Sequence, residues 1–272
     1  MKPIKKYIDV EQAIRDKNKS LARWMPRFIL NYIKRIVHEE DLNGGMAMVA
    51  HFEGLDFVNA SLDFFNASVE AHGIENIPKT GGCILASNHP LGGLDGMAFM
   101  KAVSQTRADM KFLVNDILMN IKNLHSVFLP INKHGTNPRK ALKLIDDAYA
   151  SDEATLIFPA GLVSRKIDGQ IQDLQWHKSF IGKSIQHKKD IIPVYIDGKN
   201  SSFFYNLSRL RSKLGIKANI EMFYLADEMF KQSGKTIKVF FGKPIPYTHF
   251  DKSKNQKEWA KIVRDKAYQL YK

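Results

Sequence analysis

A histidine and an aspartate lie six positions apart in the segment Ser87–Asp95, which reads Ser-Asn-His-Pro-Leu-Gly-Gly-Leu-Asp. His89 follows a short apolar run, and Asp95 comes after a turn that contains two glycines. Histidine titrates near neutral pH, so its imidazole can accept a proton from an alcohol. A carboxylate on the other ring nitrogen would fix the tautomer and stabilise the imidazolium. The segment therefore predicts a general base, His89, oriented by Asp95, and no serine partner is needed if the alcohol belongs to the substrate.

Three further segments couple an apolar run to residues that suit a binding site: Phe128–Gly135, Phe158–Lys166 and Ile191–Tyr195. If the four runs are strands whose ends meet at one edge of a sheet, they describe an open α/β active site, where ligands lie beyond the strand ends. Pro193 lacks a backbone N–H and predicts a sheet edge or a bulge in the fourth run. The candidate substrate-binding residues are Asn88, Gly92, Gly93, Lys133, Gly161, Ser164, Arg165 and Lys166.

The cations of this set, Lys133, Arg165 and Lys166, would bind an acidic head group or the phosphate of an acyl carrier. Taken singly, each could equally be a solvated surface charge. Backbone N–H groups near Gly92, Gly93 or Gly161 are candidates for stabilising an oxyanion.

Alternation of short apolar runs with helical patterns predicts an α/β fold with a mixed central sheet flanked by helices. Residues 1–75 read as an N-terminal helical segment, and residues 76–272 as an α/β domain that ends in a helix. The predicted strands are Cys83–Ser87, Lys111–Val114, Val127–Ile131, Thr155–Phe158, Ile191–Ile196, Asn219–Phe223 and Thr236–Phe241. The predicted helices of this domain include Leu94–Ser104, Pro138–Ala150 and Lys178–His187.

The segment Leu21–Val37 has the composition of a helix that lies in a membrane interface. Trp24 and Phe28 belong to a wide apolar stripe, and Arg27, Lys34 and Arg35 flank it. Aromatic residues beside basic ones favour contact with lipid. Docking of the same helix on the α/β domain explains the stripe equally well, and both can hold together.

Composition narrows the class of partner. The chain has 41 Lys and Arg against 28 Asp and Glu, a formal net charge of +13. Such an excess favours an anionic membrane surface, an acidic partner protein or nucleic acid. No zinc-finger spacing, RNP-type motif or arginine-rich arm argues for nucleic acid, and no histidine pattern predicts a metal site. The single cysteine, Cys83, and the lack of a signal-type apolar segment predict a cytoplasmic protein.

The four segments, in this order, resemble the glycerolipid (lysophospholipid) acyltransferase family. The resemblance covers residues 83–196 and extends plausibly over 76–245. It implies that His89 deprotonates an acceptor hydroxyl, that Asp95 is its partner, and that the hydroxyl attacks an acyl thioester of acyl carrier protein or coenzyme A. It also implies that no bound cofactor is required, that acidic acyl carrier protein is a partner, and that the enzyme lies peripherally on the inner face of the cell membrane.

The departures from the family pattern concern the acceptor. Five residues separate His89 from Asp95 where the family usually has four, Lys133 stands for an arginine, and Ala160 stands for a glutamate. The altered positions normally hold glycerol phosphate, so we expect a monoacylated amino-acid lipid as acceptor, and the form of the first segment resembles the bacterial branch that makes ornithine or glycine lipids. The alternatives are a 1-acylglycerol-3-phosphate acyltransferase and a noncatalytic, basic lipid- or nucleic-acid-binding protein of the same fold.

Overall fold

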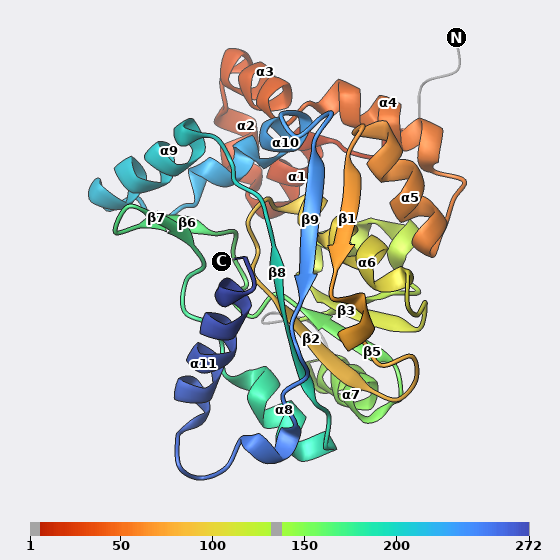
Figure 1. Ribbon diagram of the computed structural model, residues 1–272. Coiled ribbons are helices and arrows are strands. Elements are labelled where there is room, and N and C mark those ends of the chain that lie inside the picture. Colours follow the sequence, from red (N-terminus) through yellow and green to blue (C-terminus); the bar gives the residue numbers. More distant parts are fainter. Residues whose placement is uncertain (1–5, 132–137, 272) are drawn as a thin grey trace.

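Seven strands form one central sheet in the computed structural model, which describes residues 6–131 and 138–271 (Figure 1). Their spatial order is β1-β9-β8-β2-β5-β3-β4, and only the β8–β9 pair is antiparallel. A separate hairpin consists of β6 (Arg165–Ile167) and β7 (Gln170–Gln172). The strands of the main sheet are β1 (Ser68–His72), β2 (Cys83–Ser87), β3 (Met110–Val114), β4 (Phe128–Pro130), β5 (Ala154–Ile157), β8 (Ile191–Ile196) and β9 (Thr236–Phe241).

Helices precede the sheet, connect its strands and close the chain. The α-helices are α1 (Val10–Lys17), α2 (Lys19–Trp24), α3 (Arg27–Ile36), α4 (Glu39–Val49), α5 (Gly54–Phe64), α6 (Gly93–Ser104), α7 (Pro138–Ala150), α8 (Ser179–His187), α9 (Ser202–Lys213), α10 (Leu225–Phe230) and α11 (Gln256–Gln269). Short 3-10 helices are η1 (Ile74–Asn76), η2 (Asp116–Asn120), η3 (Lys122–Leu124), η4 (Ile220–Tyr224) and η5 (Tyr247–His249). The mixed sheet flanked by helices confirms the predicted fold class.

Two predictions of secondary structure are wrong. The apolar run Asn219–Phe223 forms the 3-10 helix η4 instead of a strand, and its central residue, Glu221, turns inward to two arginines. Residues 1–75 are not wholly helical, because Ser68–His72 forms β1 and pairs in parallel with β9. In β1 only Val69 and Ala71 are apolar, so this short edge strand has little hydrophobic signal.

Pro193 lies in an interior strand, so the prediction of an edge is wrong and that of a bulge fits better. The β8–β9 ladder stops at the pair Val194–Phe241, and the next bridged pair is Ile191–Ile245, with the Gly242 N–H donating to the Pro193 carbonyl at 2.9 Å between them. Two residues of β8 thus face three residues of the opposite chain, which is the count of a β-bulge. The missing N–H of the proline therefore falls where the ladder is already interrupted.

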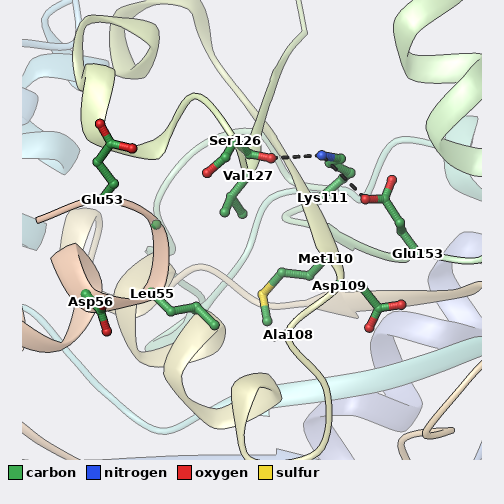
Figure 2. A pocket seen from close by; sticks show the side chains of 11 residues that line it. Glu53, Leu55, Asp56, Ala108, Asp109, Met110, Lys111, Ser126, Val127 and Glu153 are labelled. Carbon is green, nitrogen blue, oxygen red and sulfur yellow. Dashed lines mark hydrogen bonds and ion pairs between the residues drawn. The ribbon is translucent and has the colours of Figure 1, made fainter.

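The amino and carboxyl ends of the parallel strands differ in character. A pocket of about 280 Å³ lies at the amino end of β3, beside the start of α5 (Figure 2). Three of its charged side chains are paired within the protein: Lys111 forms an ion pair with Glu153 at 3.4 Å and donates to the Ser126 carbonyl, and Asp109 is paired with Arg107. The catalytic candidates follow the carboxyl ends of the strands and therefore lie at the opposite end of the sheet from this pocket.

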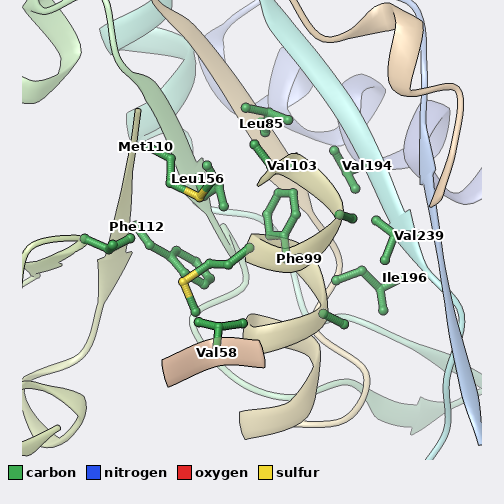
Figure 3. Packing of buried hydrophobic residues seen from close by; sticks show 14 of the residues in the cluster. Val58, Leu85, Phe99, Val103, Met110, Phe112, Leu156, Val194, Ile196 and Val239 are labelled. Carbon is green, nitrogen blue, oxygen red and sulfur yellow. The ribbon is translucent and has the colours of Figure 1, made fainter. Parts of the chain in front are cut away.

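The core is divided by the sheet. On one face, α5 and α6 pack Val58 and Phe99 against strand residues such as Leu85 (Figure 3). On the other face, α7, α8 and α11 cover Ile84 and Ala86. Adjacent residues of β2 thus enter opposite layers, as the period of two in a strand requires. Both layers bury β2 completely and hold the residues that follow it in place.

Candidate active site

Asn88 anchors the first residues after β2 to the neighbouring strand. Its side-chain amide donates to the carbonyl of Ile196 at 2.9 Å, and its amide oxygen accepts the Ile196 N–H at 2.7 Å. The residue is buried, so the two bonds replace a rung of the sheet ladder beyond the end of β2. Asn88, predicted to bind substrate, is therefore placed as a structural clamp that fixes the position of His89.

The turn after His89 is closed by Asp95, the third residue of α6. Its carboxylate accepts the N–H groups of Leu91 at 2.8 Å and of Gly92 at 3.2 Å. Such bonds satisfy donors at the helix start, where a negative charge also interacts favourably with the helix dipole. Gly92 has φ 93° and ψ −122°, a conformation that is essentially restricted to glycine. This backbone accommodates the additional residue between the histidine and the aspartate.

His89 and Asp95 form a close pair. The histidine Nδ1 lies 3.0 Å and 3.1 Å from the two carboxylate oxygens, and Asp95 is fully buried. Because an ionised carboxylate only accepts, Nδ1–H is the donor and Nε2 keeps its lone pair. The imidazole stacks on Phe158 with ring centroids 4.1 Å apart and is 18% exposed. Among the hydrogen bonds of the described residues, none occupies Nε2.

Burial is the largest influence on the imidazole and by itself lowers the pKa of His89. The charge and hydrogen bond of Asp95 oppose it, and the net pKa is raised above its ordinary value of 6.5. The pair thus strengthens the basicity of a partly exposed imidazole, as a general base requires.

A second carboxylate, Asp173, holds the backbone of His89 from the other side. It accepts the His89 N–H at 3.2 Å, the Ser164 hydroxyl at 2.5 Å and the Trp176 indole N–H at 2.8 Å. Burial raises the pKa of Asp173, and these three bonds oppose the rise. The N–H of Asp173 in turn donates to the Tyr268 hydroxyl at 2.8 Å. The histidine therefore sits between β2, α6 and α11 in a fully hydrogen-bonded frame.

Ser164 and Arg165, both predicted to bind substrate, are buried. Ser164 also donates its N–H to the His89 carbonyl at 2.7 Å. Arg165 forms an ion pair with the buried Glu221 at 2.8 Å and lies over the ring of Phe204. Both side chains are engaged within the protein, and this placement favours positioning roles over direct contact with a head group.

The remaining predicted binding residues differ in accessibility. Lys166 and Gly161 are exposed, and Lys133 lies outside the described residues. The N–H of Gly161 donates to the Phe158 carbonyl at 3.0 Å, and that of Gly92 is taken by Asp95, so neither is available to an oxyanion. Gly93 opens α6 and is packed under Met229, with 3.0 Å from the sulfur to an ideal Cβ.

The predicted membrane contacts are on two helices, α2 and α3, which meet at Pro26. Trp24 is 79% exposed and Phe28 is 74% exposed, and α3 has no buried residue. Arg27 and Arg35 are exposed beside them. Lys34 is less exposed and lies 3.7 Å from Glu11 of α1. Among the described residues, no helix has the length and apolarity to cross a bilayer.

Asp173 and Glu221 are the residues that sequence reasoning missed. Asp173 lies 84 residues from the histidine that it holds, and Glu221 lies 56 residues from Arg165. Neither belongs to a motif with a recognisable spacing, so no local signal could have identified them. In the described part of the chain, no cluster of His, Cys, Asp or Glu has the arrangement of a metal site.

The chain is similar in sequence to known acyltransferases. A family model described as acyltransferase matches residues 12–272. The lyso-glycine lipid O-acyltransferase of Bacteroides thetaiotaomicron is 46% identical over 264 residues, which cover 97% of each chain. The lyso-glycine lipid O-acyltransferase of Phocaeicola vulgatus is 43% identical over 264 residues, 97% of this chain and 95% of that protein.

Among solved structures, the 1-acyl-sn-glycerophosphate (LPA) acyltransferase PlsC from Thermotoga maritima resembles the chain with a TM-score of 0.50. The two are 18% identical, and the alignment covers 80% of this chain and 78% of that one. At this identity the likeness establishes a common fold.

Proposed function

This chain belongs to the acyltransferase family, and from that premise we propose that it acylates the hydroxyl of a lysolipid with His89 as general base. The observation that carries the assignment is the pairing of the partly exposed His89 with the buried Asp95, in which Nδ1 is bound and no hydrogen bond of the described residues engages Nε2. The pair lies beyond the carboxyl end of β2, where ligands of open α/β sheets bind.

The proposed reaction requires only groups of the protein and its two substrates. Nε2 of His89 accepts the proton of the acceptor hydroxyl as the oxygen attacks the carbonyl carbon of an acyl thioester. The tetrahedral intermediate then collapses, the carbon–sulfur bond breaks, and the imidazolium returns its proton to the departing sulfur. Asp95 stabilises the imidazolium between these steps. General-base action of this kind supplies about 10²–10⁴-fold in rate.

The proposed acceptor is a lyso-glycine lipid. Two relatives that match almost their whole length bear that name. The substitution of Ala160 for the glutamate of the family pattern supports the same choice, because Ala160 is buried in the apolar layer beneath the sheet. An acceptor with a carboxylate head group would then take the place of glycerol phosphate.

The proposed donor is a fatty acyl thioester of acyl carrier protein or coenzyme A, with no bound cofactor. An acidic carrier protein would be attracted by the net charge of +13. We further propose that the enzyme works peripherally on the inner face of the cell membrane. The exposed aromatic side chains Trp24 and Phe28, next to the exposed Arg27 and Arg35, support this location.

The test is an acyl-transfer assay on purified protein. Labelled acyl-acyl carrier protein and acyl-coenzyme A are each offered with lyso-glycine lipid, lyso-ornithine lipid, lysophosphatidic acid or no acceptor. The proposal expects transfer to lyso-glycine lipid and a loss of at least about 100-fold in His89→Ala. His249→Ala, which changes a histidine of the last 3-10 helix, is the matched control and should keep full activity.

Transfer to lysophosphatidic acid alone would overturn the acceptor and keep the mechanism. Equal activity of the wild type and the folded His89→Ala protein would overturn the mechanism.

A further inference from the structure

Helix α9, far from the N-terminal helices in sequence, presents an apolar stripe that is largely exposed. Phe203, Leu207, Leu210 and Leu214 recur at the spacing of one helix face. Leu210 is 54% exposed and Leu214 is 65% exposed, whereas Phe204 and Tyr205 on the opposite side of the helix are buried. Ile216 and Phe223, just beyond the helix, are exposed as well. We call the exposed set Phe203, Leu210, Leu214, Ile216 and Phe223 the α9 surface.

Positive charge borders the α9 surface. Residues 199–219 contain five Lys and Arg and no Asp or Glu. Arg211 is held by the buried Glu221 at 2.9 Å, but Arg209, Lys213 and Lys217 are exposed. A helix with an apolar face flanked by cations suits the interface of an anionic bilayer. Scattered apolar residues on a soluble surface need no such explanation, but a contiguous set does.

The α9 surface is joined to the exposed face of α3 through aromatic contacts. Phe203 packs edge-on against Tyr224 with ring centroids 4.9 Å apart. The Tyr224 hydroxyl lies 2.5 Å from the Tyr32 hydroxyl, and Tyr32 lines a groove of about 660 Å³ together with Phe28. In Figure 1, α3 and α9 lie at the same end of the molecule. The two helices therefore offer one extended face.

The segment 200–229, which contains the α9 surface, also packs on the turn between His89 and Asp95. Asn200, immediately before α9, donates to the Pro90 carbonyl at 3.2 Å. Leu225 of α10 lies 3.3 Å from an ideal Cβ on Gly92, and Met229 covers Gly93. A partner bound to the α9 surface would thus be held next to the turn between His89 and its aspartate.

We propose that the α9 surface is a second membrane-binding element, which acts with α3 to seat the catalytic turn against an anionic lipid surface. The inference rests on the proposed function, since it assumes a lipid acceptor that is taken from the bilayer. A carrier protein is the less favoured occupant, because the centre of the surface consists of large apolar side chains and the cations lie at its border.

Binding to vesicles tests the inference without requiring catalysis. The full chain is sedimented with vesicles of phosphatidylcholine alone, or with vesicles in which about 30% of the lipid is the anionic phosphatidylglycerol. Leu210→Ser/Leu214→Ser should bind the anionic vesicles about tenfold more weakly. Leu142→Ser/Leu144→Ser removes two exposed leucines of α7 and should bind as the wild type does.

Two further measurements identify the contact. Arg209→Gln/Lys213→Gln should weaken anionic binding about fivefold for each cation removed, whereas Lys252→Gln/Lys257→Gln should not. The sole cysteine, Cys83, is buried, so a single exposed cysteine can be labelled selectively. An environment-sensitive dye at Leu214→Cys should shift to the blue on addition of anionic vesicles, and the same dye at Leu142→Cys should not.

Unchanged vesicle binding by the folded Leu210→Ser/Leu214→Ser protein would overturn the inference. If that variant bound vesicles normally but required a higher concentration of acyl carrier protein for half-maximal rate, the surface would be a protein-docking site instead. His89→Ala separates the two proposals, because it should abolish transfer and keep vesicle binding. An inactive wild type that still bound vesicles through α9 would refute the proposed function alone.

Discussion

Replacing Asp95 by asparagine probes the catalytic pair with the smallest change of shape. In the wild type, Oδ2 accepts the N–H groups of Leu91 and Gly92 and lies 3.0 Å from Nδ1 of His89, and Oδ1 lies 3.1 Å from the same nitrogen. The asparagine oxygen must take the position of Oδ2 to keep the two backbone bonds. Its NH₂ group then takes the place of Oδ1, where an N–H would meet a protonated Nδ1. The variant therefore favours the tautomer in which Nδ1 accepts and the proton lies on Nε2.

A histidine protonated at Nε2 cannot act as a base toward the acceptor hydroxyl. We therefore expect Asp95→Asn to lose about 10²–10⁴-fold in kcat, the range of a general base, which corresponds to about 2.7–5.4 kcal/mol in activation free energy. Removal of the negative charge also lowers the pKa of His89, because Asp95 is what raises it. The acidic limb of the remaining activity should move to lower pH.

The assay is initial-rate acyl transfer from pH 5 to 9, roughly the range in which histidine titrates, with saturating acceptor and donor. Asp265→Asn, which changes a half-buried aspartate of α11 that pairs with Lys261, is the control for the loss of one charge. If Asp95→Asn folds and keeps a rate within about threefold of the wild type, a difference too small for the loss of a general base, then His89 does not act through the tautomer that Asp95 selects.

Three further outcomes are expected. Gly92→Ala and Gly81→Ala should each lower the free energy of unfolding in urea by about 1–3 kcal/mol, because both glycines have a positive φ that strains an alanine. Only Gly92→Ala should also lose activity, since Gly81 borders open space. Equal activities of the two variants would refute the role of the turn. Glu221→Gln should destabilise the fold by about 3 kcal/mol, because Arg165 is left buried without its carboxylate, and a change near zero in urea unfolding would contradict the buried pair. Because the pKa of His89 is raised in the folded state, its protonated form contributes stability that is complete below pH 6.5 and is lost as pH rises through the folded-state pKa. The free energies of unfolding of the wild type and of His89→Gln should therefore converge at high pH. If they diverge at high pH, the pKa of His89 is lowered on folding and not raised.

The contact between His89 and Asp95 was predictable from sequence because it is local. His89 and Asp95 belong to one short segment, and a strand end followed by a glycine turn and a helix start brings them together whatever the rest of the chain does. Strand β2 was equally clear from sequence, since its apolar run ends in polar residues. The structure buries all five of its residues.

One local signal was overlooked, and another was ambiguous. The hairpin β6–β7 turns at Asp168-Gly169, both with positive φ, which is a recognised two-residue turn pattern that could have predicted it. The run Asn219–Phe223 has the apolar content of a strand, but in the fold residues 220–224 form a 3-10 helix and Glu221 is buried between two arginines. Short apolar runs do not distinguish strand from helix by periodicity.

The sequence alone therefore determined the α/β class, the local pairing of His89 with Asp95, and the basic and aromatic character of Leu21–Val37. Only the tertiary structure decided that Asp173 holds the backbone of His89, that Arg165 is engaged in a buried ion pair, and that Tyr224 connects α9 to α3. The physical reason is the range of the interactions: hydrogen bonds and helix starts within a few residues follow from local sequence, whereas contacts between residues 56 or 84 positions apart depend on how the strands are ordered in the sheet.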